Sequence, residues 1–331
     1  MRLFILLIGS AFHTFSPNCI GQELYETKND FIVRSLDESY QRGLNYLAST
    51  QDKDGKWSAS SYGDQAGVVG MAILSFISRG DDPEFGNYSI HIQNALDGLL
   101  RMQNLESGFI GTTMYNHGFA TLALAELYGV LNDERIGPAL NKAVSLITSS
   151  AKSNPKNAWR YLPDSTDSDT TVSGTQIVAL LAARNAGIDV PESVIDEAIN
   201  FMTSCQDEQG GFGYTTSTGS NLPRTAIGSL VLSITGKVDS EAYKKSVGYL
   251  KKNAPYGDQG HKFYSLYYTA QAVFRADPQF WNQWNEKNVR ELLDSQQDDG
   301  SWRGNHGQAF CTCAALLSMA LNYRYLPIYE R

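Results

Sequence analysis

Two aspartates, Asp167 and Asp169, stand one residue apart directly before an apolar stretch with helical spacing that begins at Thr170. A carboxyl group buried in an apolar cavity can stay protonated at neutral pH and act as a general acid. Aspartate is also a preferred residue for capping the N-terminus of a helix, which is a purely structural role. Asp167 and Asp169 are therefore predicted as candidate catalytic residues, with helix capping as the competing interpretation.

Other polar and aromatic residues also fall at the starts of apolar helical stretches. Tyrosine ring faces can stabilise a cation or stack on a flat ligand or a sugar, although most aromatic residues of a barrel fill its core. Tyr264 and Tyr268 are four residues apart on one helical face, which favours them as ligand contacts. Without an evident nucleophile or second metal ligand, His117 and His306 are expected to be surface or capping residues, or to touch a ligand. The candidate ligand-binding residues are Asp64, Tyr115, His117, Arg224, Tyr264, Tyr268 and His306.

The cysteines give no sign of a metal site. Apart from Cys19, which falls in a predicted secretory signal over residues 1–21, the cysteines are Cys205, Cys311 and Cys313, an odd set that makes no disulfide framework. On a helix the side chains of Cys311 and Cys313 point about 200° apart, so they cannot easily share a metal ion. All three are expected to be small buried core residues, and no metal or cofactor is predicted.

A repeated turn organises the chain and places these candidates. In each full copy a glutamine precedes an aromatic residue by six positions, with a glycine one or two positions before the ring. A repeat of about fifty residues of this kind indicates stacked supersecondary units. The full copies are Gln51 to Trp57, Gln103 to Phe109, Gln206 to Phe212 and Gln296 to Trp302, and the weaker copies are Ser153 to Trp159 and Lys251 to Gly257.

Each turn lies between two helical stretches of different character. The stretch before it has one apolar stripe, as in Leu96, Leu99 and Leu100, whereas the stretch after it is apolar on most sides. A helix that is apolar on most sides must be enclosed, so the second helix of each pair is predicted to be the inner one. The terminal units lack the polar caps of an open solenoid, which favours a closed ring. The predicted fold is all-α: an α/α-toroid, a barrel of six helical hairpins, in a single domain over residues 36–326.

The turn resembles the QW motif of squalene and oxidosqualene cyclases and the related repeats of protein prenyltransferase β subunits. The resemblance covers nearly all of the chain after its first residues and implies a terpenoid cyclase-like toroid, in which the glutamine bonds backbone at a helix end. Asp167-Ser-Asp169-Thr170-Thr171 resembles the Asp-x-Asp-Asp-Thr motif of the triterpene cyclases, and Asp169 matches the proton donor. Thr170 replaces the third aspartate of that motif. The zinc ligands of the prenyltransferases are not matched, because Cys311 stands where their histidine would be.

The first residues predict export. A basic start, an apolar run from Leu3 to Phe12 and a small residue at Gly21 are typical of a secretory signal over residues 1–21. That run is too short to cross a bilayer, and no transmembrane segment is expected after cleavage. The formal charge of -8 is spread over short stretches, without a basic block that could follow a phosphate backbone, so nucleic acid is not an expected partner. The protein is expected in the periplasm or outside the cell.

Three functions remain open. The first is a binding or scaffold barrel whose mouth holds a hydrophobic or aromatic small ligand, or a protein partner. The second is a cyclase-like isomerase that uses Asp169 as its general acid. The third is a secreted carbohydrate-active enzyme, with Asp64, Asp167 and Asp169 as its carboxylates. Fold alone does not choose between them.

Overall fold

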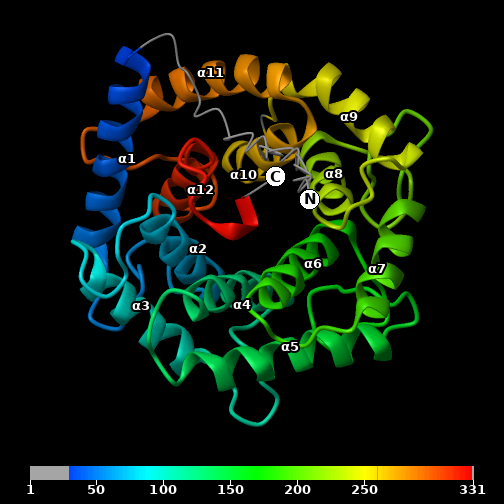
Figure 1. Cartoon of the computed structure of the whole chain (residues 1–331), viewed down its shortest axis with the longest axis horizontal. Helices are drawn as coiled ribbons and strands as arrows, with labels where there is room; N and C mark the ends of the chain where they lie inside the picture. The colour runs from blue at the N-terminus through cyan, green and yellow to red at the C-terminus, as the bar shows by residue number, and fades with distance from the viewer. Residues whose placement is uncertain (1–29, 259, 330–331) are drawn as a thin grey trace, which may run out of the picture.

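The computed structural model describes residues 30–258 and 260–329, which form twelve α-helices and two short 3₁₀ helices. Figure 1 shows the α-helices in two concentric rings. The outer ring consists of α1 (Asp30–Thr50), α3 (Ser89–Met102), α5 (Ile136–Ser153), α7 (Glu192–Ser204), α9 (Glu241–Asn253) and α11 (Pro278–Ser295). The inner ring consists of α2 (Ala66–Ile77), α4 (Met114–Tyr128), α6 (Thr170–Asn185), α8 (Leu222–Ile234), α10 (Lys262–Ala276) and α12 (Gln308–Ala320).

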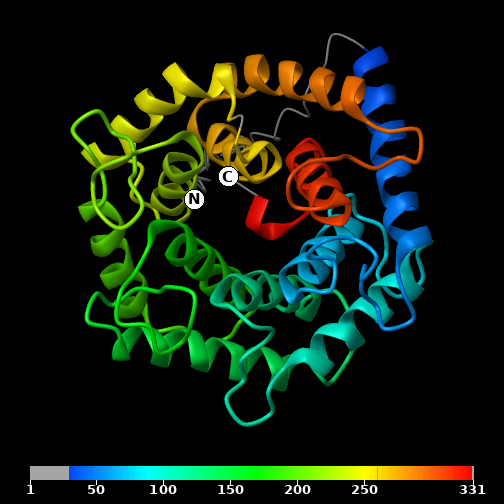
Figure 2. The same ribbon diagram turned by 180° about the vertical axis from the view of Figure 1, so that it is seen from behind.

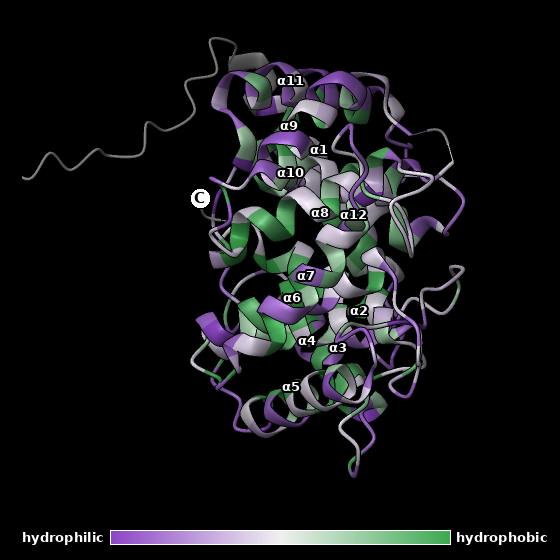
Figure 3. Ribbon diagram, turned by 90° about the vertical axis from the view of Figure 1, so that its right-hand side faces the viewer, coloured by the Kyte–Doolittle hydropathy of each residue, from purple (hydrophilic) through white to green (hydrophobic). Residues whose placement is uncertain are grey.

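Burial follows the two kinds of helix that the sequence distinguishes. Every residue of α2 is buried, whereas α3 buries one stripe that includes Ile92, Leu96 and Leu99. The side view in Figure 3 shows the same contrast, with hydrophilic residues prominent along α11 at the edge of the ring. The predicted alternation of outer and inner helices is confirmed.

The inner ring is closed. Helices α2, α4, α6, α8, α10 and α12 each contact the next, and α12 contacts α2 in turn, while α1 packs against α11 and α12. The prediction of a closed six-hairpin toroid is therefore confirmed. Because each inner helix is the second arm of a hairpin with its outer helix, all six run the same way. We call the end where they begin the mouth and the end where they finish the base.

The glutamine of each full turn joins neighbouring units. Its side-chain amide donates to a backbone carbonyl of the next outer helix, and the last of these bonds joins the sixth unit to the first. The indole N–H of each turn tryptophan donates instead to the outer helix of its own unit. The glutamine bonds are Gln51 to His91 (2.9 Å), Gln103 to Ala139 (2.9 Å), Gln206 to Ala242 (2.8 Å) and Gln296 to Ser39 (2.9 Å), and the indole bonds are Trp57 to Leu47, Trp159 to Ile147 and Trp302 to Leu292.

Replacing Gln296 by alanine is expected to lower the free energy of unfolding by about 2 kcal/mol, because three hydrogen bonds are lost and buried carbonyls are left unpaired. The amide of Gln296 donates to Ser39 and Gly300, and its oxygen accepts from the Ser39 hydroxyl. Gln206→Ala, in the middle of the chain, is the matched comparison. In a closed ring the two substitutions cost similar amounts in urea unfolding. A loss confined to Gln206→Ala would contradict closure in solution.

The base is covered by the end of the chain. Helix η2 (Pro327–Tyr329) contacts α6, and Figure 2 shows this segment reaching the centre of the ring. The Arg275 side chain of α10 donates to the carbonyl of Ile328 (2.8 Å), and the Glu126 carboxyl of α4 accepts from the Ile328 N–H. Two inner helices therefore hold one tail residue from different directions.

The remaining sequence expectations concern thiols and membrane spans. Cys205, Cys311 and Cys313 are free and buried, which confirms them as core thiols. No helix in the described part of the chain is long and apolar enough to cross a membrane. The predicted signal over residues 1–21 lies outside the described residues.

Candidate functional site

Asp169 is the N-cap of α6. Its Oδ1 accepts from the backbone N–H groups of Thr171 (2.9 Å) and Val172 (2.8 Å) and from the Thr171 hydroxyl (2.6 Å). These bonds satisfy amides that the first turn of a helix leaves without intrahelical partners. The capping role that competed with catalysis in the sequence is thus present, although it uses only one of the two carboxylate oxygens.

The second oxygen of Asp169 faces Arg160. Asp169 is fully buried, and its Oδ2 lies 3.3 Å from Arg160 Nε without the geometry of a hydrogen bond. Burial raises the pKa of Asp169, while the hydrogen bonds at Oδ1 and the Arg160 charge oppose that rise. Arg160 also pairs with the exposed carboxylate of Asp167. The Arg160 guanidinium therefore forms ion pairs with both predicted carboxylates.

Tyrosine rings and a second arginine surround this ion pair. The Arg160 guanidinium carbon lies 5.2 Å from the ring centroid of Tyr161 and 5.0 Å from that of Tyr214. Arg224 lies 4.9 Å from the same Tyr214 ring, and the Tyr161 and Tyr214 hydroxyls are hydrogen-bonded. We call Arg160, Tyr161, Asp169, Tyr214 and Arg224 the mouth cluster. It combines two cations with ring faces, a pairing that stabilises cations.

Backbone bonds between units fix the mouth cluster. Tyr161 stands two positions after Trp159, the aromatic residue of its turn. Its carbonyl accepts from the Met114 N–H at the start of α4 (2.8 Å). Tyr214 holds the equivalent position one unit later, and its carbonyl accepts from Thr170 N–H at the start of α6 (2.9 Å). These residues are therefore placed at the mouth by the repeat itself.

A line of hydroxyl groups leads from Asp169 into the barrel. The Thr171 hydroxyl donates to Asp169 and is also hydrogen-bonded to the Tyr115 phenol. Burial raises the pKa of Tyr115, and the bond to Thr171 opposes that rise. The Tyr115 and Tyr264 oxygens are 3.2 Å apart. The Tyr264 ring meets Tyr268 edge to face at 5.1 Å, and Tyr268 bonds Thr175 at 2.9 Å. The predicted residues Tyr115, Tyr264 and Tyr268 thus join the same network as Asp169.

Other predicted residues lie elsewhere. His117 is fully buried: its Nδ1 accepts from the Ile110 N–H (3.0 Å), and its Nε2 contacts the Ala143 carbonyl (3.1 Å). The expectation that His117 is a surface or capping residue is wrong, because both ring nitrogens anchor backbone. Asp64 lies outside the mouth cluster: it is exposed, and Gln65 rather than Asp64 is the N-cap of α2.

His306 is part of a different cluster. Its ring stacks on His261, with centroids 5.4 Å apart and planes 7° from parallel, and Nε2 lies 3.1 Å from His261 Nδ1. Burial, followed by the nearby His261, lowers the pKa of His306. Among the described residues, no group of three or more His, Cys, Asp or Glu side chains could hold a metal ion.

Sequence reasoning missed Arg160, Tyr161 and Tyr214. The signal was available in the repeat: they stand one or two positions after the turn ring, on the segment that leads to the mouth. What the sequence could not give is the contact between Arg160 and Tyr214, since these residues belong to neighbouring units.

The closed inner ring inside an outer ring of helices defines the fold as an α/α-toroid. MstE, a type II terpene cyclase from Scytonema, is 13% identical over 89% of this chain and 99% of its own, with a TM-score of 0.63. A glycoside hydrolase family 76 mannosidase from Bacteroides thetaiotaomicron is 9% identical over 87% and 98%, with a TM-score of 0.67. The family 76 α-1,6-mannanase from Salegentibacter is 11% identical over 86% and 98%, with a TM-score of 0.63.

At these identities the likeness shows the fold alone. No protein-family model matches the sequence, and no curated protein does so either. The architecture implied by the turn motif is nevertheless confirmed, because solved toroids match over nearly their whole length. Their chemistries differ, so the function must be argued from the mouth cluster.

Proposed function

We propose that this protein is an exported binding barrel whose mouth cluster holds a small hydrophobic or aromatic ligand carrying an acidic group. The observation that carries this proposal is the environment of Arg224. Its guanidinium lies over the Tyr214 ring and donates to the Gly219 carbonyl (2.8 Å). Across residues 30–258 and 260–329, no carboxylate lies within ion-pair distance of it.

The charges of the mouth cluster favour an anion beside Arg224 rather than Arg160. The Arg160 charge is already matched by Asp167 and Asp169. Arg224 lies in the first turn of α8, whose N-terminus also favours negative charge. A guanidinium offers a planar set of donors that suits a carboxylate. The neighbouring Tyr161 and Tyr214 rings supply a surface for a flat or apolar portion of the same ligand.

One solved neighbour offers support of a general kind. An MstE variant binds geranylgeranyl dihydroxybenzoate, its substrate, which joins an aromatic acid to a long isoprenoid chain. A toroid of this fold can therefore accept a ligand with these two parts. For the present chain this remains part of the proposal, because identity to that structure is 14%.

Arg224→Gln is expected to weaken binding of an acidic ligand by about 10- to 100-fold, since a charge-assisted hydrogen bond contributes about 1.5–3 kcal/mol. Calorimetry would compare geranyl-substituted hydroxybenzoate with its neutral carboxamide. The wild type is expected to prefer the acid, and Arg224→Gln to lose that preference. Arg184→Gln, at an exposed arginine in the last turn of α6, is the matched control. Equal binding of acid and amide by the wild type would overturn the proposal.

A second candidate function rests on the free oxygen of Asp169. Burial raises the pKa of this carboxyl, and its Oδ2 has no hydrogen bond. A protonated Asp169 would transfer its proton to an alkene, and the resulting cation would close a ring and lose another proton, which completes an isomerisation. The pairing with Arg160 favours the carboxylate instead. Binding is therefore better supported than catalysis. Catalysis would become the better supported function if the wild type converted an isoprenoid and Asp169→Asn did not.

Carbohydrate processing is the weaker alternative. Asp167 and Asp169 meet at Arg160, and the Tyr161 and Tyr214 rings could stack on a sugar. Both carboxylates lie against the same guanidinium, whose charge favours their ionised forms and so works against a protonated general acid. Asp64, the third predicted carboxylate, contacts Gln65 at 3.1 Å and is exposed.

A further inference from the structure

The fifth unit lacks the turn that fills the other units. Four of the six turns bury a ring at the motif position, namely Trp57, Trp159, Phe212 and Trp302, and the second turn buries Ile110 there. The fifth turn is replaced by η1 (Ala254–Tyr256), and the Tyr256 side chain is 80% exposed. The turn of this unit therefore buries no ring against α10.

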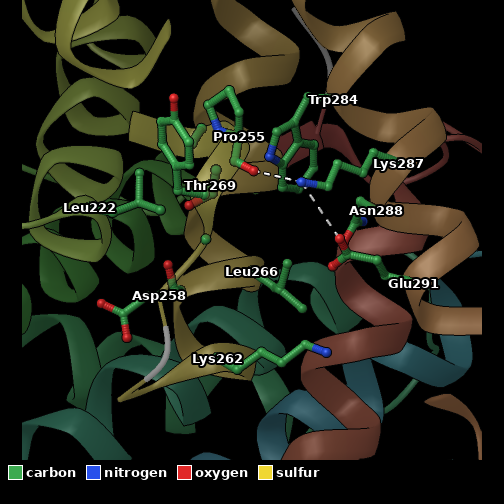
Figure 4. Close-up of a pocket in the computed structure, with 14 residues that line it drawn as sticks. Leu222, Pro255, Asp258, Lys262, Leu266, Thr269, Trp284, Lys287, Asn288 and Glu291 are labelled. Atoms are coloured by element: carbon green, nitrogen blue, oxygen red, sulfur yellow. Dashed lines mark hydrogen bonds and ion pairs between the residues drawn. The ribbon is translucent and has the colours of Figure 1, made fainter. Parts of the chain in front are cut away.

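A cavity of about 170 Å³ lies where that ring is missing. Figure 4 shows it between α10 and α11, with side chains from both helices turned toward it. Its inner walls include Ser265, Leu266 and Thr269 from α10 and Trp284 and Asn288 from α11. A cavity of roughly 150 Å³ can enclose a six-membered ring such as benzene.

The repeat explains why a polar residue faces this cavity. In four other units, the fourth or fifth residue of the inner helix accepts a backbone N–H from the turn. These residues are His117, Ser173, Thr225 and Thr312, which accept from Ile110, Trp159, Phe212 and Trp302. Ser265 is the fourth residue of α10, but it lines the cavity instead.

Two buried polar atoms in the wall have no partner. Thr269 Oγ1 and Asn288 Oδ1 make no hydrogen bond, and the two residues are 1% and 4% exposed. The amide nitrogen of Asn288 is directed to Ser318 on α12 (3.5 Å), which leaves the oxygen as an acceptor without a donor. Unpaired buried polar atoms cost about 1–3 kcal/mol each, a cost that a polar occupant would relieve.

The charges at the rim are balanced. Lys287 donates to the Pro255 carbonyl (2.6 Å) and pairs with Glu291 at 3.7 Å, as the dashed lines in Figure 4 mark. Lys262 and Asp258 bring one further charge of each sign. A rim with two positive and two negative groups does not select an ion.

We propose that this cavity is a binding site for a neutral hydroxylated ring of monosaccharide size, separate from the mouth cluster. Hydroxyl groups donate and accept, so they satisfy Asn288 Oδ1 and Thr269 Oγ1 together. Trp284 and Leu266 provide apolar walls for the C–H face of such a ring. The site lies between the fifth and sixth units and does not require the function proposed for the mouth.

Calorimetry and saturation-transfer NMR with glucose, mannose and myo-inositol would test this site, with cyclohexanol, a ring of similar size that carries a single hydroxyl, as the less polar probe. Binding of at least one of the three polyols, and weaker binding of cyclohexanol, is expected. Asn288→Leu and Thr269→Val should each weaken polyol binding about tenfold, since each removes a hydrogen bond and keeps the volume. Both variants should stay folded, because removing an unpaired buried polar atom is near neutral for stability.

Arg224→Gln separates this site from the mouth, and polyol binding is expected to be unchanged in that variant. Absence of polyol binding at high millimolar concentration would overturn the proposal. Tighter binding of cyclohexanol than of every polyol would do so too, because the cavity would then select apolar ligands. Equal affinities of the wild type and both cavity variants would place any polyol elsewhere on the protein.

Discussion

Trp302→Ala is expected to lower the free energy of unfolding by about 4 kcal/mol, the cost of removing a fully enclosed indole from a core. Trp302 is 0% exposed, and its Nε1–H donates to the Leu292 carbonyl (2.9 Å). A Cβ added at Gly43 of α1 would lie 3.0 Å from the indole and 2.8 Å from Leu316 of α12. The indole therefore fills the junction between the first and last units, where the ring closes.

Trp302→Phe is the matched control, because Phe212 holds the same buried position in the fourth turn. It keeps a ring in the junction and loses one hydrogen bond and part of the volume, so a loss of about 1.5 kcal/mol is expected. Urea unfolding followed by circular dichroism gives both values. Similar losses in the two variants would contradict a junction held mainly by ring packing.

The fold could be predicted because each unit repeats its signals locally. Gly300 shows why the turn is recognisable: its φ is +87°, and an added Cβ would lie 2.3 Å from the Arg42 carbonyl oxygen. Glycine is the residue that adopts this conformation without steric cost. Constraints of this kind, together with the contrast between striped and wholly apolar helices, specify hairpins, and the absence of polar end units indicated closure.

The site was only partly predictable, because its contacts join different units. Asp169, Tyr115 and Tyr264 could be proposed from their places at helix starts, yet nothing local shows that Thr171 and Tyr115 connect them. The prediction that His117 is a surface or capping residue was wrong for a local reason. Its neighbours in sequence suggested an exposed helix start, whereas the turn of its own unit folds over it and buries it.

The fifth unit shows how a weak copy of a repeat can be informative. The sequence of residues 251–257 keeps little of the turn pattern, which on its own signals only divergence. In the structure, the absence of the full turn motif here coincides with a cavity whose wall has unpaired polar atoms. The sequence shows where the turn motif is incomplete. It does not show the cavity, because that depends on how α10 and α11 pack without a ring from the turn.

Glu126→Gln is expected to remove about 3 kcal/mol of pH dependence from the stability of the barrel, since each pKa unit is worth about 1.4 kcal/mol. Burial raises the pKa of Glu126 from 4.5 to about 7. Below pH 4.5 the carboxyl is protonated in both the folded and unfolded states, so its full contribution is present. As the pH rises, the unfolded chain ionises first, and the contribution is lost through pH 7.

In the wild type, His117 offsets this loss of stability. Its own contribution to the free energy of unfolding changes in the opposite direction over nearly the same pH range. Burial lowers the pKa of His117 from 6.5 to about 4, so the neutral ring stabilises the fold above pH 6.5, and that stability is lost as the pH falls toward 4. The contributions of Glu126 and His117 are therefore expected to offset each other in the wild type between pH 4.5 and 6.5. Subtracting the wild-type profile from the Glu126→Gln profile cancels His117 and isolates Glu126.

The measurement is urea unfolding of the wild type and Glu126→Gln between pH 4.5 and 8. Glutamine can still accept from the Ile328 N–H that Glu126 bonds, so the tail should remain on the base. The variant is expected to gain stability relative to the wild type as the pH rises, by about 3 kcal/mol in total. The control is the exposed Glu134→Gln. A constant difference between the wild type and Glu126→Gln would show that Glu126 is ionised in the folded barrel throughout, and that water or another group compensates its charge at the base.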